Sequence, residues 1–374
     1  MTRFRGAVLR DRGLPRPYAE SRPLEIIELE LPDPGPGEVL VEIGAASLCR
    51  SDLSVVNGAR VWPLPMVIGH EAAGKVAAVG PGVTALDPGD DVVLVYLPQC
   101  GDCVRCRAGE AWLCEVGAAA NQKGELLTGG TRLTHRGEKL HHHMGVAAFA
   151  EYTLVSEASA VKLPPGLEAR DTCLFGCAVL CGAGTALNTA GVGEDDSVAV
   201  VGLGAVGLSA ILGAKAAGAE RIVAVDRLDA KLAPAASLGA TDVLVADEQT
   251  PTLVAEKTAG GVDHAIEASG TLEGFELAMQ LVRRGGTVTT LGLPGPGVSH
   301  HLELAPLVAG GGTVRGSYLG SCVTRRDVPH FIDLYREGRF PVDELISHRL
   351  RLDDINVALD RLADGEALRQ VIEF

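Results

Sequence analysis

The stretch Ser197-Val-Ala-Val-Val-Gly202-Leu-Gly204-Ala-Val-Gly207 decides the fold of the second half of the chain. Its apolar run Val198–Val201 predicts a strand that leads directly into a G-x-G-x-x-G motif, and Leu208–Ala217 predicts a helix after it. In such a unit the first glycine permits a tight turn, the second leaves room for a pyrophosphate, and the third lets helix and strand pack closely. The helix N-terminus then offers N–H groups to the phosphates. The motif therefore predicts a dinucleotide site, with a glycine turn that binds nothing as the alternative.

Asp226 bears on the choice of dinucleotide. It ends the next predicted strand, 22 residues after Gly204. A carboxylate at this place accepts hydrogen bonds from the adenosine ribose and repels a 2′-phosphate, which favours NAD over NADP. Arg227 follows directly and could pair with a 2′-phosphate, so NADP stays open as an alternative.

Apolar segments at α/β spacing predict the sheet of this second domain. Short buried strands with helices between them are typical of a parallel doubly wound sheet. Six segments fit this pattern, namely Val198–Val201, Arg221–Val225, Asp242–Val245, Asp263–Glu267, Gly286–Leu291 and Thr313–Gly316.

The first third of the chain has a different pattern, in which short β-like runs are separated by Gly- and Pro-rich turns. Such a pattern predicts a compact antiparallel β domain. Near the C-terminus, two amphipathic helices and a last strand are expected to complete that domain. The β-like runs are Glu25–Leu31, Glu38–Ile43, Gly74–Val79 and Asp91–Val95, and the late elements are Val328–Glu337, Asp353–Leu362 and Arg369–Phe374.

Composition narrows the class of protein. The chain has 374 residues, enough for two domains, and its 47% hydrophobic and 22% charged residues are typical of globular proteins. A net charge of −15 argues against a nucleic-acid partner, which requires basic patches. No apolar run of 18 residues predicts a membrane span, and no signal-peptide core follows Met1, so a cytoplasmic protein is expected. The nine cysteines then indicate reduced thiols and metal ligation rather than disulfides.

Four cysteines on one polar segment predict a structural zinc lobe. Cys100, Cys103, Cys106 and Cys114 follow the pattern C-x2-C-x2-C-x7-C. Four thiolates at this spacing can reach one ion and suit a closed tetrahedral Zn²⁺ site. Because the segment has no apolar periodicity, the metal would supply its folding free energy. An iron–sulfur centre is the alternative, although its usual motif closes with a shorter gap followed by proline.

A second, scattered set of possible ligands consists of Cys49, His70 and Cys177. Their flanks are Cys49-Arg-Ser-Asp52, Gly69-His-Glu-Ala-Ala-Gly74 and Gly176-Cys177. Together with the cysteine lobe and the dinucleotide motif, they resemble the zinc-dependent medium-chain dehydrogenase family, in the alcohol dehydrogenase branch that has a long segment after the lobe. The resemblance implies a GroES-like catalytic domain at 1–178 and 319–374, with the lobe at 99–115, and a Rossmann NAD-binding domain at 179–318.

The resemblance also implies roles for single residues. Cys49, His70 and Cys177 would hold a catalytic zinc with an open fourth position, and Asp52 would accept a hydrogen bond from His70. Glu71 would lie beside the metal, unless it is only a local ion-pair partner. The cofactor would be held by Gly202, Gly204, Gly207, Asp226, Arg50, Lys231 and Arg369.

Proton transfer is where the chain departs from the animal enzymes of the family. Ser51 would take the alcohol proton and pass it through the ribose hydroxyls, but Ser54 stands where many of those enzymes have a histidine. A serine is no base near pH 7, so the proton would leave through water or another group. The histidines at 141–143 could hold a metal, but they are expected to be packed or solvated rings, because no carboxylate or cysteine is expected to lie close to them. The remaining thiols are expected to be small core residues, namely Cys173, Cys181 and Cys322.

The substrate pocket is also inferred from positions in the family's motifs. It would be lined by Ser51 and by Arg60, Tyr96, Ala119, Met144, Leu293 and Tyr318. Arg60 is unusual, because enzymes for small alcohols have an apolar side chain there. Its guanidinium would either attract an anionic substrate or extend into solvent.

The sequence as a whole indicates an NAD-dependent zinc alcohol dehydrogenase with two zinc ions per chain. It would interconvert an alcohol with an aldehyde or ketone. An S-hydroxymethyl-thiol (formaldehyde) dehydrogenase is the alternative, although the acidic residues usual beside its pocket are absent from Asn57–Leu64. A second alternative is a non-catalytic zinc- and NAD-binding protein. The resemblance further implies a homodimer joined near Thr313–Leu319, with no nucleic-acid or membrane partner.

Overall fold

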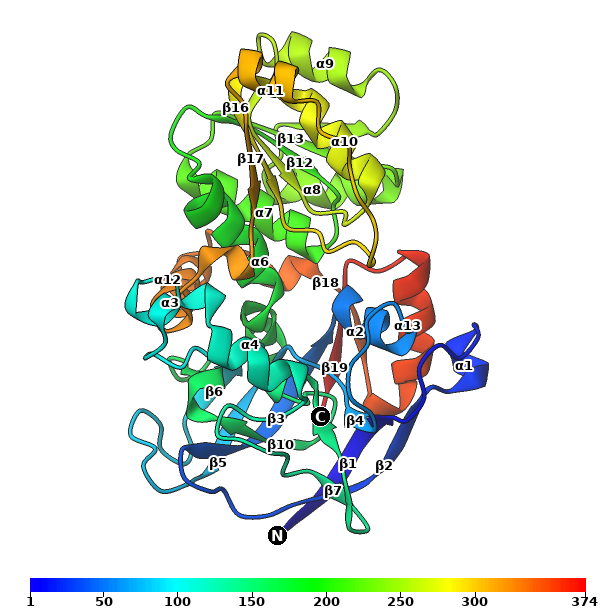
Figure 1. The fold of residues 1–374 in the computed structure, drawn as a ribbon, viewed down its shortest axis with the longest axis vertical. Helices are drawn as coiled ribbons and strands as arrows, with labels where there is room; N and C mark the ends of the chain where they lie inside the picture. Colours follow the sequence, from blue (N-terminus) through cyan, green and yellow to red (C-terminus); the bar gives the residue numbers. More distant parts are fainter. The chain divides into compact units, whose positions relative to one another are not determined.

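The computed structural model describes residues 1–374, which form two compact units (Figure 1). The first unit comprises Met1–Cys177, Val323–Ile332 and Ile346–Phe374. The second comprises Ala178–Cys322 and Asp333–Leu345. The chain thus leaves the first unit, builds most of the second, and returns.

The first unit contains two sheets. The smaller has the strand order β8-β7-β2-β1-β4-β9, and the larger has the order β11-β6-β5-β3-β19-β18, with β10 also paired to β3. The strands of the smaller sheet are β1 (Thr2–Leu9), β2 (Leu24–Leu31), β4 (Met66–Val67), β7 (Thr134–His135), β8 (Glu138–Lys139) and β9 (His141–His142). Those of the larger are β3 (Glu38–Leu48), β5 (Ala72–Val79), β6 (Asp91–Leu94), β10 (Tyr152–Ser156), β11 (Ala160–Lys162), β18 (Ile346–Leu350) and β19 (Arg369–Glu373).

The prediction of a purely antiparallel first domain is wrong at two pairs of strands. β4 runs parallel to β9, and β18 runs parallel to β19. Parallel neighbours need a long crossover connection, which the segments between these strands provide. Turn signals and alternation identify strands but do not give the direction in which distant strands pair.

Strand β3 organises the core of the first unit. Val39, Val41 and Ile43 contribute to one hydrophobic cluster, while Leu40 contributes to another. Because successive side chains of a strand point to opposite faces, β3 is buried on both sides. Its far end leads directly into Cys49, one residue of the candidate metal site.

The second unit is built on a six-stranded parallel sheet of order β14-β13-β12-β15-β16-β17 (Figure 1). All five neighbouring pairs are parallel, which confirms the predicted doubly wound sheet. The order reverses between β12 and β15, where ligands bind in such folds. The strands are β12 (Ser197–Val201), β13 (Arg221–Asp226), β14 (Asp242–Val245), β15 (Val262–Glu267), β16 (Val282–Thr290) and β17 (Thr313–Gly316).

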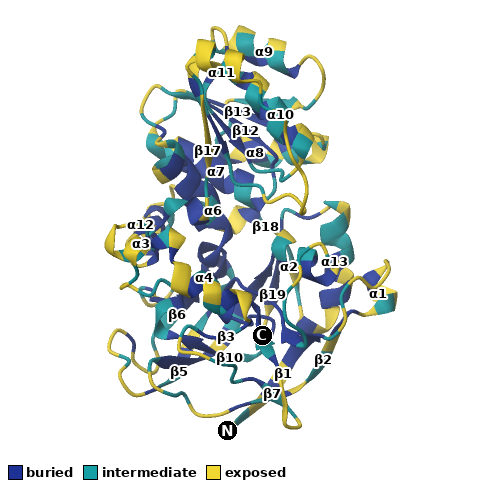
Figure 2. Ribbon diagram, viewed as in Figure 1, coloured by how far each residue is buried: buried dark blue, intermediate teal, exposed yellow.

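Helices cover both faces of this sheet. Ala199 and Val201 of β12 share a cluster with side chains of α9 and α10, whereas α7 packs against β12 and β13 without joining that cluster. The central strands β12 and β13 are largely buried, whereas α11 is largely exposed (Figure 2). The helices of this unit are α6 (Ala178–Gly184), the π-helix Thr185–Ala190, α7 (Ala205–Ala217), α8 (Leu232–Leu238), α9 (Thr250–Lys257), α10 (Leu272–Leu281) and α11 (Leu304–Gly310).

The remaining helices belong to the first unit or cross between the two. They are α1 (Tyr18–Ser21), α2 (Arg50–Val56), α3 (Val104–Arg107), α4 (Glu115–Gln122), α5 (Ala169–Thr172), α12 (Thr324–Arg336) and α13 (Ile355–Asp364).

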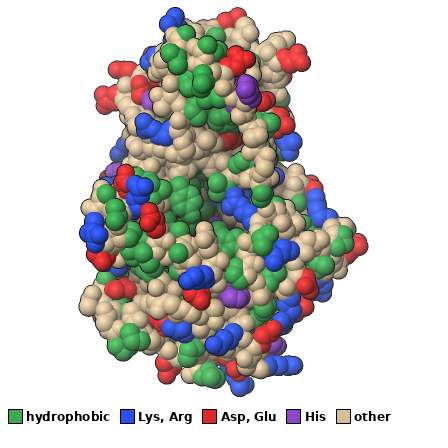
Figure 3. Space-filling view, viewed as in Figure 1, with side chains coloured by type: hydrophobic (Ala, Val, Ile, Leu, Met, Phe, Trp, Pro, Cys, Tyr) green, Lys and Arg blue, Asp and Glu red, His purple; other side chains and the backbone are tan.

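No single helix is long and apolar enough to cross a membrane, and only the bent pair Ala169–Gly176 and Ala178–Ala190 together meets that test of length and composition. On the face shown in Figure 3, Lys and Arg are interspersed with Asp and Glu.

Candidate metal and cofactor sites

Cys49, His70 and Cys177 come together in the first unit. Their ligand atoms all lie within 4.8 Å of one another, and the three residues are only 7%, 1% and 5% exposed. Cys49 follows β3, His70 precedes β5, and Cys177 follows a short 3-10 helix. Two cysteines and a histidine are a known ligand set of catalytic zinc, and they leave a fourth position for water or substrate.

The loop before His70 requires a glycine. Gly69 has φ +97°, and a Cβ on it would lie 2.6 Å from the ring of Phe149. The backbone N–H groups of Ala148 and Phe149 donate to the carbonyls of Gly69 and Ile68, at 3.0 and 2.9 Å. The segment around Phe149 therefore fixes the approach of the chain to His70.

Cys49 is prepared as a ligand by its neighbours. It caps helix α2, and its backbone N–H donates to Oδ2 of Asp52 at 2.8 Å, in the manner of a capping box. A hydrogen bond from Cys177, and the nearby His70 and Arg369, hold the pKa of the Cys49 thiol well below its usual range although burial opposes this. The thiolate is the form that binds zinc.

Asp52 fixes the orientation of His70. Its Oδ1 lies 2.7 Å from Nδ1 of His70, and both side chains are buried. Burial opposes ionisation, but His70 and His143 lower the pKa of Asp52 well below its usual range. With Nδ1 turned to the carboxylate, Nε2 is the ring nitrogen left to hold a metal.

His143 lies beside the candidate metal ligands, which the sequence did not reveal. Its Nδ1 lies 3.2 Å from Oδ1 of Asp52, and its ring meets those of His70 and Trp62 edge-on at 5.4 and 5.5 Å. The expectation that no carboxylate lies near the histidines at 141–143 is therefore wrong, because the fold brings Asp52 to the third of them. Its place directly before Met144, a predicted pocket residue, was the available signal.

The other two histidines of that run behave as expected. Burial lowers the pKa of His142 to about 3, so its ring is neutral, and its Nε2 accepts a hydrogen bond from the backbone of Arg132. His141 is half-buried and belongs to β9.

Glu71 and Arg369 form a buried ion pair beside the cysteines and His70. Oε2 of Glu71 lies 3.3 Å from Nη1 of Arg369, and the side chains are 0% and 4% exposed. Arg369 also donates to the carbonyl of Leu48 at 2.7 Å. Burial lowers the pKa of Arg369, but Glu71 and Cys49 more than offset it. Glu71 thus has an ion-pair partner, as the alternative to a place beside the metal expected. A contact of Arg369 with the cofactor stays a prediction.

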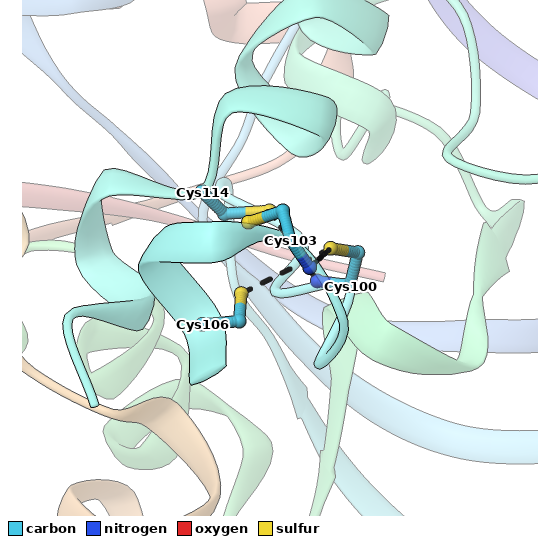
Figure 4. A group of neighbouring side chains, drawn as sticks. All are labelled: Cys100, Cys103, Cys106 and Cys114. Atoms are coloured by element: carbon cyan, nitrogen blue, oxygen red, sulfur yellow. Dashed lines mark hydrogen bonds between the residues drawn. The ribbon is translucent and has the colours of Figure 1, made fainter. Parts of the chain in front are cut away.

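The four cysteines of the lobe surround one point (Figure 4). Sγ of Cys100 lies 3.9 Å from that of Cys106, and Sγ of Cys103 lies 4.0 Å from that of Cys114. A tetrahedron with Zn–S bonds of ~2.3 Å has S–S edges of roughly 3.8 Å, so the thiols are spaced for zinc. None forms a disulfide.

Backbone groups of the lobe also point at the sulfurs. Cys103 donates its N–H to Sγ of Cys100 at 3.4 Å, and Gly117 donates to Sγ of Cys114 at 3.3 Å. A backbone hydrogen bond from Cys106 lowers the pKa of Cys103. Val104, in the middle of the lobe, is 69% exposed, so the lobe has little apolar core of its own.

The glycine motif of the second unit has the geometry of a dinucleotide site. Gly202 has φ +95°, and a Cβ on Gly207 would lie 1.9 Å from the carbonyl oxygen of Gly202. A Cβ on Gly204 would meet nothing within 4 Å, so the space before the N-terminus of α7 is open. Asp226 is 9% exposed, and its carboxylate accepts hydrogen bonds from the N–H groups of Leu203 and Leu228 at 2.7 and 2.9 Å.

Comparisons with known proteins identify the family of the chain. Residues 35–165 match the alcohol dehydrogenase GroES-like domain, and residues 205–337 match the zinc-binding dehydrogenases. S-(hydroxymethyl)glutathione dehydrogenase of Synechocystis sp. is 37% identical over 362 residues, which are 96% of this chain and 98% of that protein. Alcohol dehydrogenase class-3 of Myxine glutinosa is 37% identical over 364 residues, 96% of each protein. The chain belongs to the zinc-dependent medium-chain dehydrogenase family.

A solved structure extends the agreement to the fold. Benzyl alcohol dehydrogenase from Acinetobacter calcoaceticus has a TM-score of 0.92 at 32% identity, with 100% of both chains covered. The predicted GroES-like and Rossmann fold classes are thereby confirmed. Like its family, this protein is an oxidoreductase that uses zinc and a nicotinamide dinucleotide.

In this dehydrogenase the predicted pocket residues of the first unit differ in burial and in the contacts they make. The ring of Tyr96 meets that of His70 edge-on at 5.8 Å, and Met144 is 8% exposed with φ +50°. Arg60 is half-buried after α2, and Ala119 lies on an exposed position of α4. Tyr96 thus lies beside the candidate ligand His70, and Met144 directly follows His143, whose ring also contacts that of His70.

The other predicted residues lie as follows. Arg50 is the exposed first residue of α2, Ser51 is half-buried, and the hydroxyl of Ser54 donates to the carbonyl of Arg50 at 2.9 Å. In the second unit Leu293 and Tyr318 are 58% and 38% exposed. Lys231 there is half-buried, and Cys173 and Cys322 are buried while Cys181 is half-buried.

Proposed function

We propose that this protein is an NAD-dependent zinc alcohol dehydrogenase. The convergence of Cys49, His70 and Cys177 on one point carries the proposal, because an enzyme that had lost its activity would not need an intact open ligand set. In this proposal residues 1–178 and 319–374 form the catalytic domain, although Asp333–Leu345 of that range lie in the second unit of the structure. Residues 179–318 bind the dinucleotide.

Each side chain of the site has a proposed role in metal binding or proton transfer. Cys49, His70 and Cys177 hold the metal, and Asp52 keeps Nε2 of His70 turned to it. When bound, zinc acts as a Lewis acid on the alcohol oxygen, and NAD accepts the hydride. Ser51 accepts the alcohol proton and passes it on. The hydroxyl of Ser54 donates to the carbonyl of Arg50. Because a hydroxyl is no base near neutral pH, it can relay a proton but cannot store one.

The cofactor contacts follow from the second unit and from the predicted basic residues. The open space over Gly204 and the N–H groups of α7 suit a pyrophosphate. Gly202 and Gly207 hold the turn, and Asp226 faces the adenosine ribose. Arg50, Lys231 and Arg369 are proposed to supply positive charge to the dinucleotide.

Turnover with a panel of substrates tests this function. Primary, secondary and benzylic alcohols are supplied with NAD, and S-hydroxymethylglutathione is supplied in parallel, each with and without a strong chelator. Turnover of free alcohols that the chelator abolishes would support the proposal. Turnover confined to the thiol adduct would favour the formaldehyde dehydrogenase alternative, which the name of the Synechocystis relative supports. No turnover, with zinc and NAD bound, would leave a non-catalytic protein.

Cofactor choice is expected to depend on Asp226. The parent should use NAD with a kcat/KM at least tenfold above that for NADP, about the 1.4 kcal/mol that one unfavourable charge contact can supply. Asp226→Gly should narrow or invert this ratio, because the repelling charge is gone and Arg227 is free to meet a 2′-phosphate. Initial rates with both cofactors measure the ratio.

A matched control separates charge from loop damage. Asp229→Gly removes an exposed acid three residues further along, and it should leave the ratio unchanged. Asp226→Asn keeps the shape of the side chain that binds Leu203 and Leu228, and it should narrow the ratio as the glycine does. Equal use of NAD and NADP by the parent would contradict the assignment.

A cytoplasmic homodimer is the proposed state of this enzyme, joined through β17. That strand is at the edge of the sheet, its residues are exposed, and α11 beside it carries Leu304 and Val308 at 69% and 79% exposure. Pairing of two such edges would cover both. Light scattering should give twice the mass of 38.8 kDa.

A lysine at each edge of the sheet tests the interface. Val314→Lys on β17 should yield monomers, since it places like charges across the two-fold axis. Val245→Lys on β14, the opposite edge, is the matched control and should remain dimeric. A monomeric parent at micromolar concentration would contradict the dimer, and a tetramer would show that a further interface exists.

A further inference from the structure

The carboxylate of Asp52 lies against two imidazoles rather than one. Oδ2 accepts the N–H of Cys49 at 2.8 Å, while Oδ1 faces Nδ1 of His70 at 2.7 Å and Nδ1 of His143 at 3.2 Å. Asp52, His70 and His143 are 0%, 1% and 0% exposed, so water does not screen these contacts. The contact with His143 is the longer one, and it falls outside the geometry of a full hydrogen bond.

The fold holds His143 in this place by several independent contacts. It begins a short 3-10 helix in which Met144 has φ +50°, and the next turn contains Ala147 at φ +56°. Left-handed backbone at residues with side chains costs of order 1–3 kcal/mol each and persists only where the surroundings determine it. Here the N–H groups of Val146 and Ala147 both donate to the carbonyl of His143, at 3.0 and 3.1 Å.

Other segments of the chain connect this turn to the loop that contains His70. The N–H of Ala148 donates to the carbonyl of Gly69, one residue before His70. The hydroxyl of Thr153 donates to the carbonyl of Val146, and the ring of Trp62 meets that of His143 edge-on. The approach of His143 to Asp52 is therefore specified by the chain on either side of it.

We propose that His143 is a positioning residue that shares the Asp52 carboxylate with His70 and thereby sets how tightly the catalytic zinc is held. A carboxylate that accepts the Nδ1–H of a metal-bound histidine raises the basicity of the ring as a ligand. A second N–H directed at the same oxygen draws part of that negative charge to itself, so less is available to His70. The protein thus holds its zinc more loosely, and leaves it a stronger Lewis acid, than Asp52 alone would dictate. The inference rests on the proposed function, because it requires zinc at Cys49, His70 and Cys177.

Two substitutions distinguish this role from simple packing. His143→Phe keeps a planar ring beside Trp62 but removes the N–H directed at Asp52. His143→Asn is smaller, yet its amide nitrogen can occupy the place of Nδ1 and restore the donor. If the role is one of packing, phenylalanine is the milder change, and if it is one of charge sharing, asparagine is the milder change.

The measurement is the rate at which the holoenzyme releases zinc to an excess of a colorimetric chelator. Zinc should be released in two kinetic phases, one from each zinc site. The phase that is missing from the Cys177→Ser protein is assigned to the site at Cys49, His70 and Cys177. His143→Phe should slow this phase by about tenfold, the lower end of the ~10–100-fold effects of residues that contact metal ligands. His143→Asn should release zinc at the parent rate, and the lobe phase should be the same in all variants.

The outcomes that overturn the inference are distinct. If His143→Phe releases zinc as fast as the parent or faster, or if His143→Asn behaves like His143→Phe, the sharing of Asp52 is wrong. His143→Leu, which also lacks the donor, takes the place of phenylalanine if that ring disturbs the fold. A parent enzyme without the phase assigned to Cys177 would overturn the proposed function together with this inference, whereas a normal phase that His143 does not influence would overturn the inference alone.

Discussion

Cys177→Ser is expected to remove one of about two zinc ions per chain and to abolish turnover while the fold remains. The thiolate of Cys177 is one of three ligands, and a serine hydroxyl is a poor substitute because it stays protonated near neutral pH. Loss of the Lewis acid costs several kcal/mol of transition-state stabilisation, so kcat should fall by about 10³-fold or more. Metal analysis and alcohol oxidation on the same sample measure both effects.

The small change in shape predicts that the first unit stays intact. Cys177 is 5% exposed and serine is slightly smaller, so the thermal midpoint should move by little. Cys173→Ser is the matched control, since Cys173 lies four residues earlier, is fully buried, and donates to the carbonyl of Arg170 rather than to a metal. It should retain both zinc ions and most of the activity. A Cys177→Ser enzyme with two zinc ions and parental turnover would show that the catalytic ligands are other residues.

Cys103→Ser is expected to have its largest effect on stability rather than on chemistry. The lobe contributes little to the core, because Cys103 and Cys106 are partly exposed and Val104 is 69% exposed. Zinc binding to comparable cysteine sites is worth ~10–16 kcal/mol in isolated peptides, and it is the main source of order for such a segment. Loss of one ligand should therefore cost on the order of 3 kcal/mol, which lowers the thermal midpoint by roughly 6–12 °C.

Proteolysis locates the damage. Cleavage between Cys100 and Cys114 should become faster in Cys103→Ser, whereas cleavage elsewhere should not. Cys181→Ser, the same chemical change at a half-buried thiol outside the lobe, should leave the midpoint and the zinc content unchanged. If Cys103→Ser is as stable as the parent, the lobe does not depend on a metal.

The parts of the molecule that the sequence predicted correctly are those with a local physical signature. The strand, glycine motif and helix of 197–217 reappear as β12 and α7, and each of the predicted α/β strands is present. The cysteine spacing of the lobe likewise forces its sulfurs together whatever the rest of the chain does. In these cases the interacting groups are close in sequence, so the spacing of the residues is enough to predict how they lie in space.

The failures all concern contacts between distant segments. Nothing near His143 in the sequence shows that Asp52, about 90 positions earlier, will lie beside it. The parallel pairing of β18 with β19 is equally invisible, because alternation gives the faces of a strand and not its neighbours. Family resemblance supplied Cys49, His70 and Cys177, but it did not supply the contact between Asp52 and His143.

The pairing of β19 with β3 has a consequence for how the enzyme is made. β19 carries Arg369, and its partner strand ends at Leu48, directly before Cys49. About 300 residues separate Glu71 from the arginine that neutralises it. At ~5–20 residues per second a ribosome needs roughly 15–60 s to synthesise them. Most of the second unit emerges in that interval, while Glu71 still lacks its counter-charge. The metal ligands can therefore reach their final surroundings only after Arg369 has been synthesised, so loading of the catalytic zinc should follow the synthesis of most of the second unit.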